Sequence, residues 1–171
     1  MGTTIIAACV ALQEAPYLVR YEASPPQVVS AMLELAQVTE KDVVFDLGCG
    51  DGRIVIAAAK RYGARGVCVD IDPRRIAEAR DNAAEAGVAQ KIEFREEDAM
   101  RTNLSGASVV TLFLSYDFNL ALQPKLEREL APGTRIVSHW HRMGEWPLEG
   151  TVHVKGAERG NDVFLYRTRP R

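Results

Sequence analysis

A glycine-rich turn directly after a buried strand constrains this chain most. Residues 43–47 form an apolar run broken only by Asp46, and such a run is typical of a strand buried in a parallel sheet. The turn reads Gly48-Cys49-Gly50-Asp51-Gly52, and a helical pattern follows from Arg53. Glycines in a strand–turn–helix unit let a ligand lie against the backbone. The sequence therefore predicts an α/β fold that binds a ligand at this turn.

Strand and helix patterns alternate along the rest of the chain. Ser24 is expected to cap the first helix, because two prolines follow it in the first turn. The predicted helices are 26–37, 53–62, 73–87 and 120–130, and the predicted strands are 43–47, 66–69, 91–95, 109–114, 135–138, 151–154 and 163–167. These patterns predict a Rossmann-like sheet of seven strands, mostly parallel with a C-terminal antiparallel hairpin and with helices on both faces.

Acidic residues follow three successive predicted strands. Asp46 can take the amino group of a bound amino acid, and Asp70, 24 residues later, can accept both hydroxyls of a ribose. Asp72 is the rival for the ribose, although Asp72 before a proline also reads as a helix cap. Asp98, beside Ala99, can accept from an adenine amino group. Such parallel sheets bind ligands at the carboxyl ends of their strands, so we expect these side chains to meet there.

The glycine spacing is G-x-G-x-G, whereas a nicotinamide-dinucleotide fingerprint is G-x-G-x-x-G. Together with the three carboxylates, the turn resembles the S-adenosylmethionine (SAM) pocket of class I methyltransferases. The resemblance implies SAM as cofactor, S-adenosyl-L-homocysteine as product, and a seven-strand class I methyltransferase fold. The cofactor-binding residues that it implies are Tyr21, Asp46, Gly48, Cys49, Gly50, Asp70, Ile71, Asp98, Ala99 and Leu114.

A longer run, Gly50-Asp51-Gly52-Arg53-Ile54-Val55-Ile56-Ala57-Ala58-Ala59, is similar to the first motif of the lysine methyltransferases that act on the ATP synthase c subunit and the adenine nucleotide translocase. Residues 125–130 and Trp146-Pro147 also resemble that family. Residues 19–25 stand where the family has a segment that closes over the cofactor. The resemblance implies methylation of a lysine on a protein partner. A small-molecule methyltransferase is the alternative, and a SAM-binding regulatory module without turnover is a second one.

The acceptor side is expected at the end of the fourth predicted strand. Tyr116 and Asp117 are candidates for positioning or deprotonating the acceptor, although Asp117 can also cap the next helix. His139 is a candidate for proton handling or for the substrate rim. A metal pair of His139 with His141 is the weaker interpretation, because no third ligand is near in sequence, and we predict no metal site. Trp140 and Trp146 either wall the acceptor channel or lie in the core.

The chain of 171 residues divides into an N-terminal segment, residues 1–23, and a methyltransferase domain, residues 24–171. The apolar run at residues 5–12 is too short to span a membrane, and no basic residue precedes it. A cytoplasmic protein is therefore expected, with a targeting remnant and membrane attachment as the alternatives. The net charge of −2 makes nucleic acid an unlikely partner.

The three cysteines are Cys9, Cys49 and Cys68, a number that cannot pair completely. Cys49 and Cys68 fall in apolar segments, where we interpret them as small buried hydrophobic residues. On that interpretation a reducing compartment is expected.

Overall fold

The structure is a computed structural model, and it describes residues 20–156 and 161–170. The helices are α1 (Pro26–Leu35), α2 (Arg53–Tyr62), α3 (Pro73–Glu85) and α4 (Tyr116–Glu129), with a short 3-10 helix η1 (Ala89–Lys91). The strands are β1 (Val43–Leu47), β2 (Arg65–Asp70), β3 (Ile92–Glu96), β4 (Val109–Leu112), β5 (Arg135–His139), β6 (Leu148–His153) and β7 (Asp162–Arg167).

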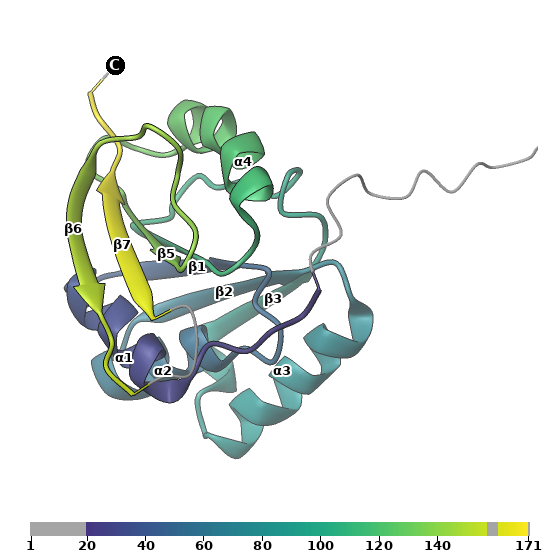
Figure 1. Cartoon of the computed structure of the whole chain (residues 1–171). Helices are drawn as coiled ribbons and strands as arrows, with labels where there is room; N and C mark the ends of the chain where they lie inside the picture. Colours follow the sequence, from purple (N-terminus) through teal and green to yellow (C-terminus); the bar gives the residue numbers. More distant parts are fainter. Residues whose placement is uncertain (1–19, 157–160, 171) are drawn as a thin grey trace, which may run out of the picture.

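The seven strands form one sheet in the order β3-β2-β1-β4-β5-β7-β6 (Figure 1). The first five strands are parallel neighbours, and β7 runs antiparallel to both β5 and β6. The order reverses between β1 and β4, which places the end of β1 at the switch point where such sheets bind ligands. The predicted Rossmann-like sheet with its closing antiparallel hairpin is confirmed.

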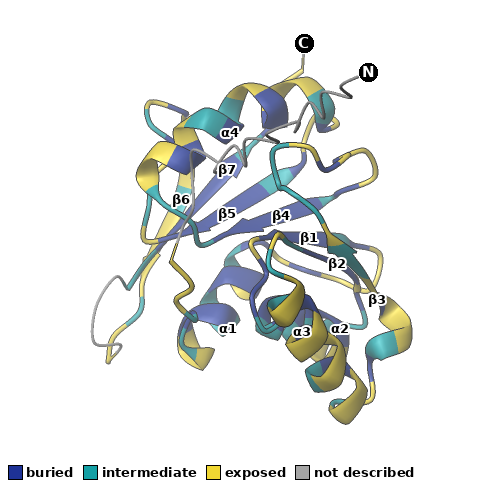
Figure 2. Ribbon diagram, turned by 90° about the vertical axis from the view of Figure 1, so that its right-hand side faces the viewer, coloured by how far each residue is buried: buried dark blue, intermediate teal, exposed yellow. Residues whose placement is uncertain are grey.

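Helices cover both faces of the sheet unequally. Helices α1, α2 and α3 pack on one face and α4 packs on the other (Figures 1 and 2). Alternate residues of β1 serve the two sides, since Val44 belongs to the core under α1–α3 whereas Phe45 and Leu47 belong to the core under α4. Both cores exclude water from the central strands, and this fixes the positions from which the strand ends project.

Several element ends differ from the prediction. Ser24 does not cap α1, because Pro25 occupies the N-cap position without a side-chain hydrogen bond. Helix α4 begins at Tyr116 instead of residue 120, and Ser115 is its cap. Strand β4 ends at Leu112, two residues early, and β6 begins three residues early at Leu148. The helix was predicted too short because Tyr, Asp, Phe and Asn in its first turn are all weak helix formers.

No helix in residues 20–156 or 161–170 is both long enough and apolar enough to cross a bilayer. The predicted N-terminal segment falls almost wholly outside the described residues, of which only 20–23 belong to it.

Candidate active site

Three glycines shape the turn that follows β1. Gly48, Gly50 and Gly52 have φ values of 78°, 54° and 79°, a region that side chains disfavour. Space is also limiting at Gly50, where an added Cβ would lie 2.2 Å from Cε2 of Tyr21. The turn therefore presents bare backbone toward the end of the sheet, as a close-lying ligand requires.

The turn is fastened to the end of β2 by three hydrogen bonds. The amides of Gly48 and Cys49 donate to the carbonyl oxygen of Val69 at 2.8 and 2.9 Å. The amide of Gly50 donates to Oδ2 of Asp70 at 2.9 Å. The carboxylate of Asp70 thus lies directly against the glycine turn.

The two rival carboxylates after β2 have separate positions. Asp72 is the N-cap of α3: its Oδ1 accepts from the amide of Arg74 at 2.9 Å. Asp70 accepts from the amide of Asp72 with its other oxygen, also at 2.9 Å. Between them, the side chain of Ile71 is 50% exposed. Asp72 is therefore a helix cap, and Asp70 is the carboxylate that faces the turn.

Asp46 ends β1 as a buried acid. Its side chain is 2% exposed, and its Oδ1 accepts from the hydroxyl of Thr111 at 2.7 Å. Burial raises the pKa of Asp46 to about 7; the charges of Asp70 and Asp51 act in the same direction, and the Thr111 hydrogen bond opposes them. A carboxylate in this position is stabilised by a cationic group brought next to it.

A third carboxylate follows β3 at the same sheet edge. The amide of Glu97 donates to the carbonyl oxygen of Asp70 at 3.0 Å, which ties the exits of β2 and β3 together. Asp98 is half-buried, and its Oδ1 accepts from the amide of Met100 at 2.8 Å. Ala99 is half-buried beside it. The predicted acidic residues therefore stand at the ends of adjacent strands.

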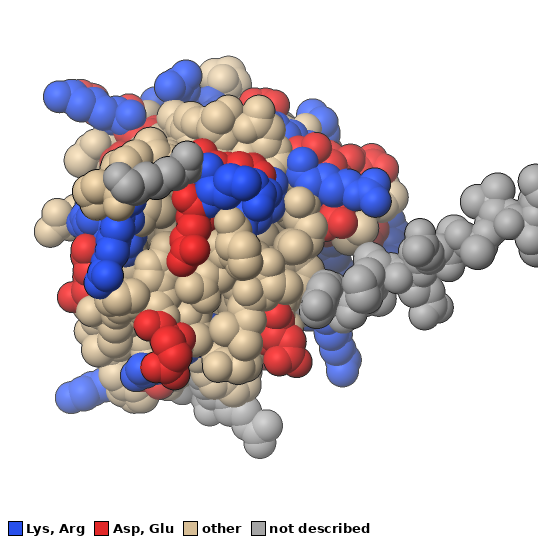
Figure 3. All heavy atoms as spheres, turned by 90° about the horizontal axis from the view of Figure 1, so that it is seen from above, with Lys and Arg blue, Asp and Glu red and all other residues tan. Residues whose placement is uncertain are grey.

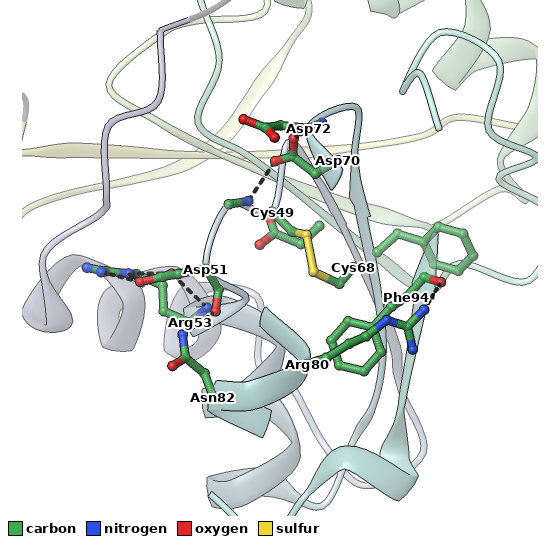
Figure 4. The surroundings of a disulfide bond; sticks show 12 residues. Cys49, Asp51, Arg53, Cys68, Asp70, Asp72, Arg80, Asn82 and Phe94 are labelled. Atoms are coloured by element: carbon green, nitrogen blue, oxygen red, sulfur yellow. Dashed lines mark hydrogen bonds and ion pairs between the residues drawn. A yellow bond between two sulfur atoms is a disulfide. The ribbon is translucent and has the colours of Figure 1, made fainter. Parts of the chain in front are cut away.

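Cys49 and Cys68 form a disulfide, with their Cα atoms 5.3 Å apart (Figure 4). The prediction of two separate buried thiols is wrong, although both residues are buried. The strand register explains the pairing: Cys68 lies opposite Asp46, and the turn after β1 folds Cys49 back over β2. The expectation of a reducing compartment rested on unpaired cysteines and loses that support.

The chain ahead of α1 crosses the same end of the sheet. We call residues 20–25 the strap. The hydroxyl of Ser24 lies 2.8 Å from Nδ1 of His139, and the guanidinium of Arg53 donates to the carbonyl oxygen of Ser24 at 2.9 Å. Arg53 is itself paired with Asp51 at 2.5 Å. The glycine turn and the end of β5 thus hold the strap from two sides.

Tyr21 is the strap residue that covers the turn. Its ring occupies the space over Gly50, and the guanidinium of Arg75 lies 3.9 Å from the ring centroid. Burial raises the pKa of the Tyr21 hydroxyl, and the negative charge of Asp51 adds to that effect. The predicted contribution of Tyr21 to the cofactor site has a geometric basis in this contact.

A cleft open to solvent separates the strap from the ends of β1 and β4. Its empty volume is about 280 Å³. The residues that line it are Tyr21, Glu22, Ala23, Ser24, Asp46, Gly48, Cys49, Asp51, Arg53, Ile54 and Phe113. Sequence reasoning had not singled out Glu22, Arg53 or Phe113 for this site. The Gly-Asp-Gly-Arg run was the available signal for Arg53, whereas the other two depend on long-range packing.

The end of β4 lies on the other side of the glycine turn. Leu114 contacts the turn, since a Cβ at Gly48 would lie 2.6 Å from Cδ2 of Leu114. Tyr116 and Asp117 are exposed in the first turn of α4. Ser115 caps that helix by accepting from the amide of Phe118 at 3.2 Å, so Asp117 is not the cap.

His139 and His141 diverge instead of facing one side. The chain turns at Trp140, which has a φ of 66°, and the amide of His141 donates to the carbonyl oxygen of His139 at 2.8 Å. The His139 ring is 1% exposed and lies 3.9 Å from the ring of Phe113. In the residues that the structure describes, no three metal-ligating side chains converge.

Comparison with known proteins gives consistent results. The family model for the ANTKMT methyltransferase domain matches residues 46–150, which is more than half of the chain. The chain belongs to this methyltransferase family. A protein-lysine N-methyltransferase from Saccharolobus islandicus is 42% identical over 86% of this chain and 92% of its own length. The human lysine N-methyltransferase named for the ATP synthase c subunit is 37% identical over 72% of this chain, which spans about half of the human protein.

A solved relative gives a more detailed comparison. A structure described as an RNA methyltransferase from Salinibacter ruber, in complex with S-adenosyl-L-homocysteine, is 47% identical with a TM-score of 0.84. The match covers 88% of this chain and 95% of that one. This methyltransferase therefore uses SAM as its methyl donor. Its site fits that cofactor, because bare glycine backbone, a buried carboxylate and the Asp70 carboxylate meet at one place.

Proposed function

We propose that this methyltransferase transfers the methyl group of SAM to the side-chain amine of a lysine in a protein. The observation that carries the proposal is the Saccharolobus islandicus protein-lysine N-methyltransferase, which is 42% identical over most of both chains. The open cleft supports it, because the side chain of a folded or unfolded protein can reach a site that is open to solvent.

Each carboxylate has a proposed role toward the cofactor. Asp46 binds the α-amino group of SAM, since a cation relieves the unfavourable burial of its charge. Asp70 binds the ribose hydroxyls, and its contact with the Gly50 amide sets its orientation. Asp98, with Ala99 beside it, binds the adenine. The remaining predicted contacts, Gly48, Cys49, Ile71, Leu114 and Tyr21, surround the same turn or border it.

SAM, when bound, supplies a methyl group on a sulfonium that is already activated for transfer. The protein therefore has to align the acceptor and let its amine lose a proton, because the pKa of a free lysine is about 10.4. Tyr116, Asp117 and Glu22 are the exposed polar groups that we propose for positioning the amine. His139 has a different proposed role: its buried ring, bonded to Ser24, holds the strap in place.

A nucleic acid acceptor is the competing hypothesis, because of the RNA methyltransferase description of the Salinibacter ruber protein. The charge of the cleft favours protein. Glu22, Asp46 and Asp51 line it, whereas Arg53 is its only lining cation among the described residues and is paired with Asp51. On the face seen in Figure 3, basic side chains are mixed with acidic ones. A polyanion binds best to a continuous basic surface, and this face does not offer one.

The test is methylation of a lysate with SAM carrying a labelled methyl group. Incorporation should resist ribonuclease, disappear with protease, and yield methylated lysine after digestion to amino acids. The Asp70→Ala variant, which loses cofactor binding, provides the background. Ribonuclease-sensitive label would replace protein with RNA, and label only in small metabolites would replace it with a small-molecule acceptor. No incorporation despite SAM binding would identify a module without turnover.

A further inference from the structure

Three large apolar side chains are exposed beside the cleft, on the acceptor side. Tyr116 is 46% exposed, Leu120 37% and Trp140 40%. Tyr116 and Leu120 are four residues apart on α4 and therefore share a helix face. Trp140 follows β5, whose neighbour in the sheet is β4. We call these three residues the platform.

Contacts between α4 and the loop after β5 make the platform one surface. The side chain of Leu120 lies over Gly144, where an added Cβ would be 2.6 Å from Cδ2 of the leucine. The amide group of Asn119 donates to the carbonyl oxygen of His141 at 3.1 Å and to the hydroxyl of Ser138 at 3.0 Å. The loop that carries Trp140 is therefore fixed to the helix that carries the other two residues.

The backbone at Trp140 is held in an unfavourable conformation. Its φ of 66° lies in a region that bulky residues rarely occupy, and the hydrogen bond from His141 to His139 closes a tight turn around it. The amide of Trp140 also donates to the carbonyl oxygen of Asp162 at 2.7 Å. Such conformations persist where the surrounding structure enforces them, and they concentrate at functional sites.

The two tryptophans of the chain differ in a way that points to function. Trp146 is 8% exposed and packs in the core near Tyr166, with ring centroids 6.3 Å apart. Trp140 is presented to solvent and stacks on His141, with ring centroids 5.3 Å apart. Of the two roles open from the sequence, a core position suits Trp146 and a wall of the acceptor channel suits Trp140.

Charge around the platform indicates what it can bind. Asp117 and Glu145 are exposed beside it, and Glu22 lies near His141 at the cleft. Arg142 is the opposing exposed cation of the loop, and its guanidinium lies 5.0 Å from the centroid of the Phe164 ring. The surroundings of the platform are thus predominantly acidic, which complements a cationic segment with apolar neighbours.

We propose that the platform binds the apolar side chains that flank the target lysine, so that the enzyme selects lysines in apolar segments. This selection rests on the proposed lysine methylation, whereas the binding surface itself does not depend on turnover. Aromatic side chains suit such a role because they supply a large contact area with few rotatable bonds.

Peptide binding tests the surface without requiring catalysis. Two labelled peptides of equal net charge, each with one central lysine, differ only in flanking residues: leucine and phenylalanine in one, glycine and serine in the other. With S-adenosyl-L-homocysteine present, fluorescence anisotropy should show about tenfold tighter binding of the apolar peptide. Trp140→Ala and Leu120→Ala should each abolish most of this preference, and Trp140→Phe should keep it.

Leu148→Ala is the matched control, because Leu148 is 38% exposed but lies on β6, away from the platform. It should leave the preference unchanged, and all variants should keep their affinity for S-adenosyl-L-homocysteine, which shows that they are folded. Equal binding of the two peptides, or a preference that survives both Trp140→Ala and Leu120→Ala, would overturn the proposal.

Turnover of the same peptides separates this inference from the proposed function. Methylation should follow the binding preference, with a lower KM for the apolar peptide. Apolar preference in binding without methylation of either peptide would refute lysine methylation and leave the docking surface standing. Methylation of both peptides at the same KM would refute selection by the platform and leave lysine methylation standing.

Discussion

Breaking the disulfide between Cys49 and Cys68 should lower the stability of this methyltransferase more than its cofactor affinity. The bridge spans a sequence separation of 19 residues, a loop that includes all of α2. Closing a loop of that length removes about 3 kcal/mol of conformational freedom from the unfolded chain. For a domain of this size, that corresponds to a fall of about 6–12 °C in unfolding temperature on reduction.

Cofactor affinity should change by no more than about twofold, a difference well below the 1.4 kcal/mol of a tenfold effect. The reason is that the amides of Gly48, Cys49 and Gly50 remain hydrogen-bonded to the end of β2 whether or not the sulfurs are joined. The disulfide therefore acts mainly on the unfolded state, whereas the hydrogen bonds maintain the shape of the folded turn.

Calorimetric unfolding with and without a phosphine reductant measures the stability effect. A Cys9→Ser background removes the third thiol, so thiol titration then reports the bridge alone. Cys68→Ala in the same background is the control: it should unfold at a lower temperature and no longer respond to reductant. An unchanged unfolding temperature after complete reduction would refute the argument. A large loss of S-adenosyl-L-homocysteine affinity would show that the bridge, and not the hydrogen bonds, shapes the turn.

Three further outcomes follow from the cofactor side of the site. Because burial raises the pKa of Asp46 to about 7 and a bound amino group favours the ionised form, SAM affinity by calorimetry should increase as the pH rises through about 7, and Asp46→Asn should flatten that profile. Gly50→Ala should weaken S-adenosyl-L-homocysteine binding at least about tenfold with an unchanged circular dichroism spectrum, because the Cβ meets a ring and strains a positive φ. Asp70→Asn should weaken SAM binding, whereas Asp72→Asn should lower only the unfolding temperature; equal affinities in the two would refute the assignment of their roles.

The parts of the fold that the sequence predicts are those with local causes. The apolar run at β1, the glycines after it and the proline at the start of α3 each act within a few residues, so strands and helices fall close to their predicted positions. The carboxylates Asp46, Asp70 and Asp98 follow from the same logic, since parallel strands end at one edge.

The parts that the sequence does not predict depend on contacts between distant residues. Cys49 and Cys68 read as separate hydrophobic residues because the strand register that joins them is absent from a local pattern. Ser24 reads as a helix cap because nothing nearby indicates a histidine 115 residues away. For α4 a local signal was present, as Ser115 is a good cap, but the weak helix formers after it outweighed that signal.

The strap has a consequence for how the protein is made. Ser24 leaves the ribosome long before His139, its partner 115 residues later, so at roughly 5–20 residues per second the two are separated by about 6–23 s of synthesis. The glycine turn and Asp70 emerge early in that interval. The nascent chain therefore carries the cofactor-binding turn for seconds before the residue that latches the strap exists, and the nucleotide end of the site is assembled before the acceptor end.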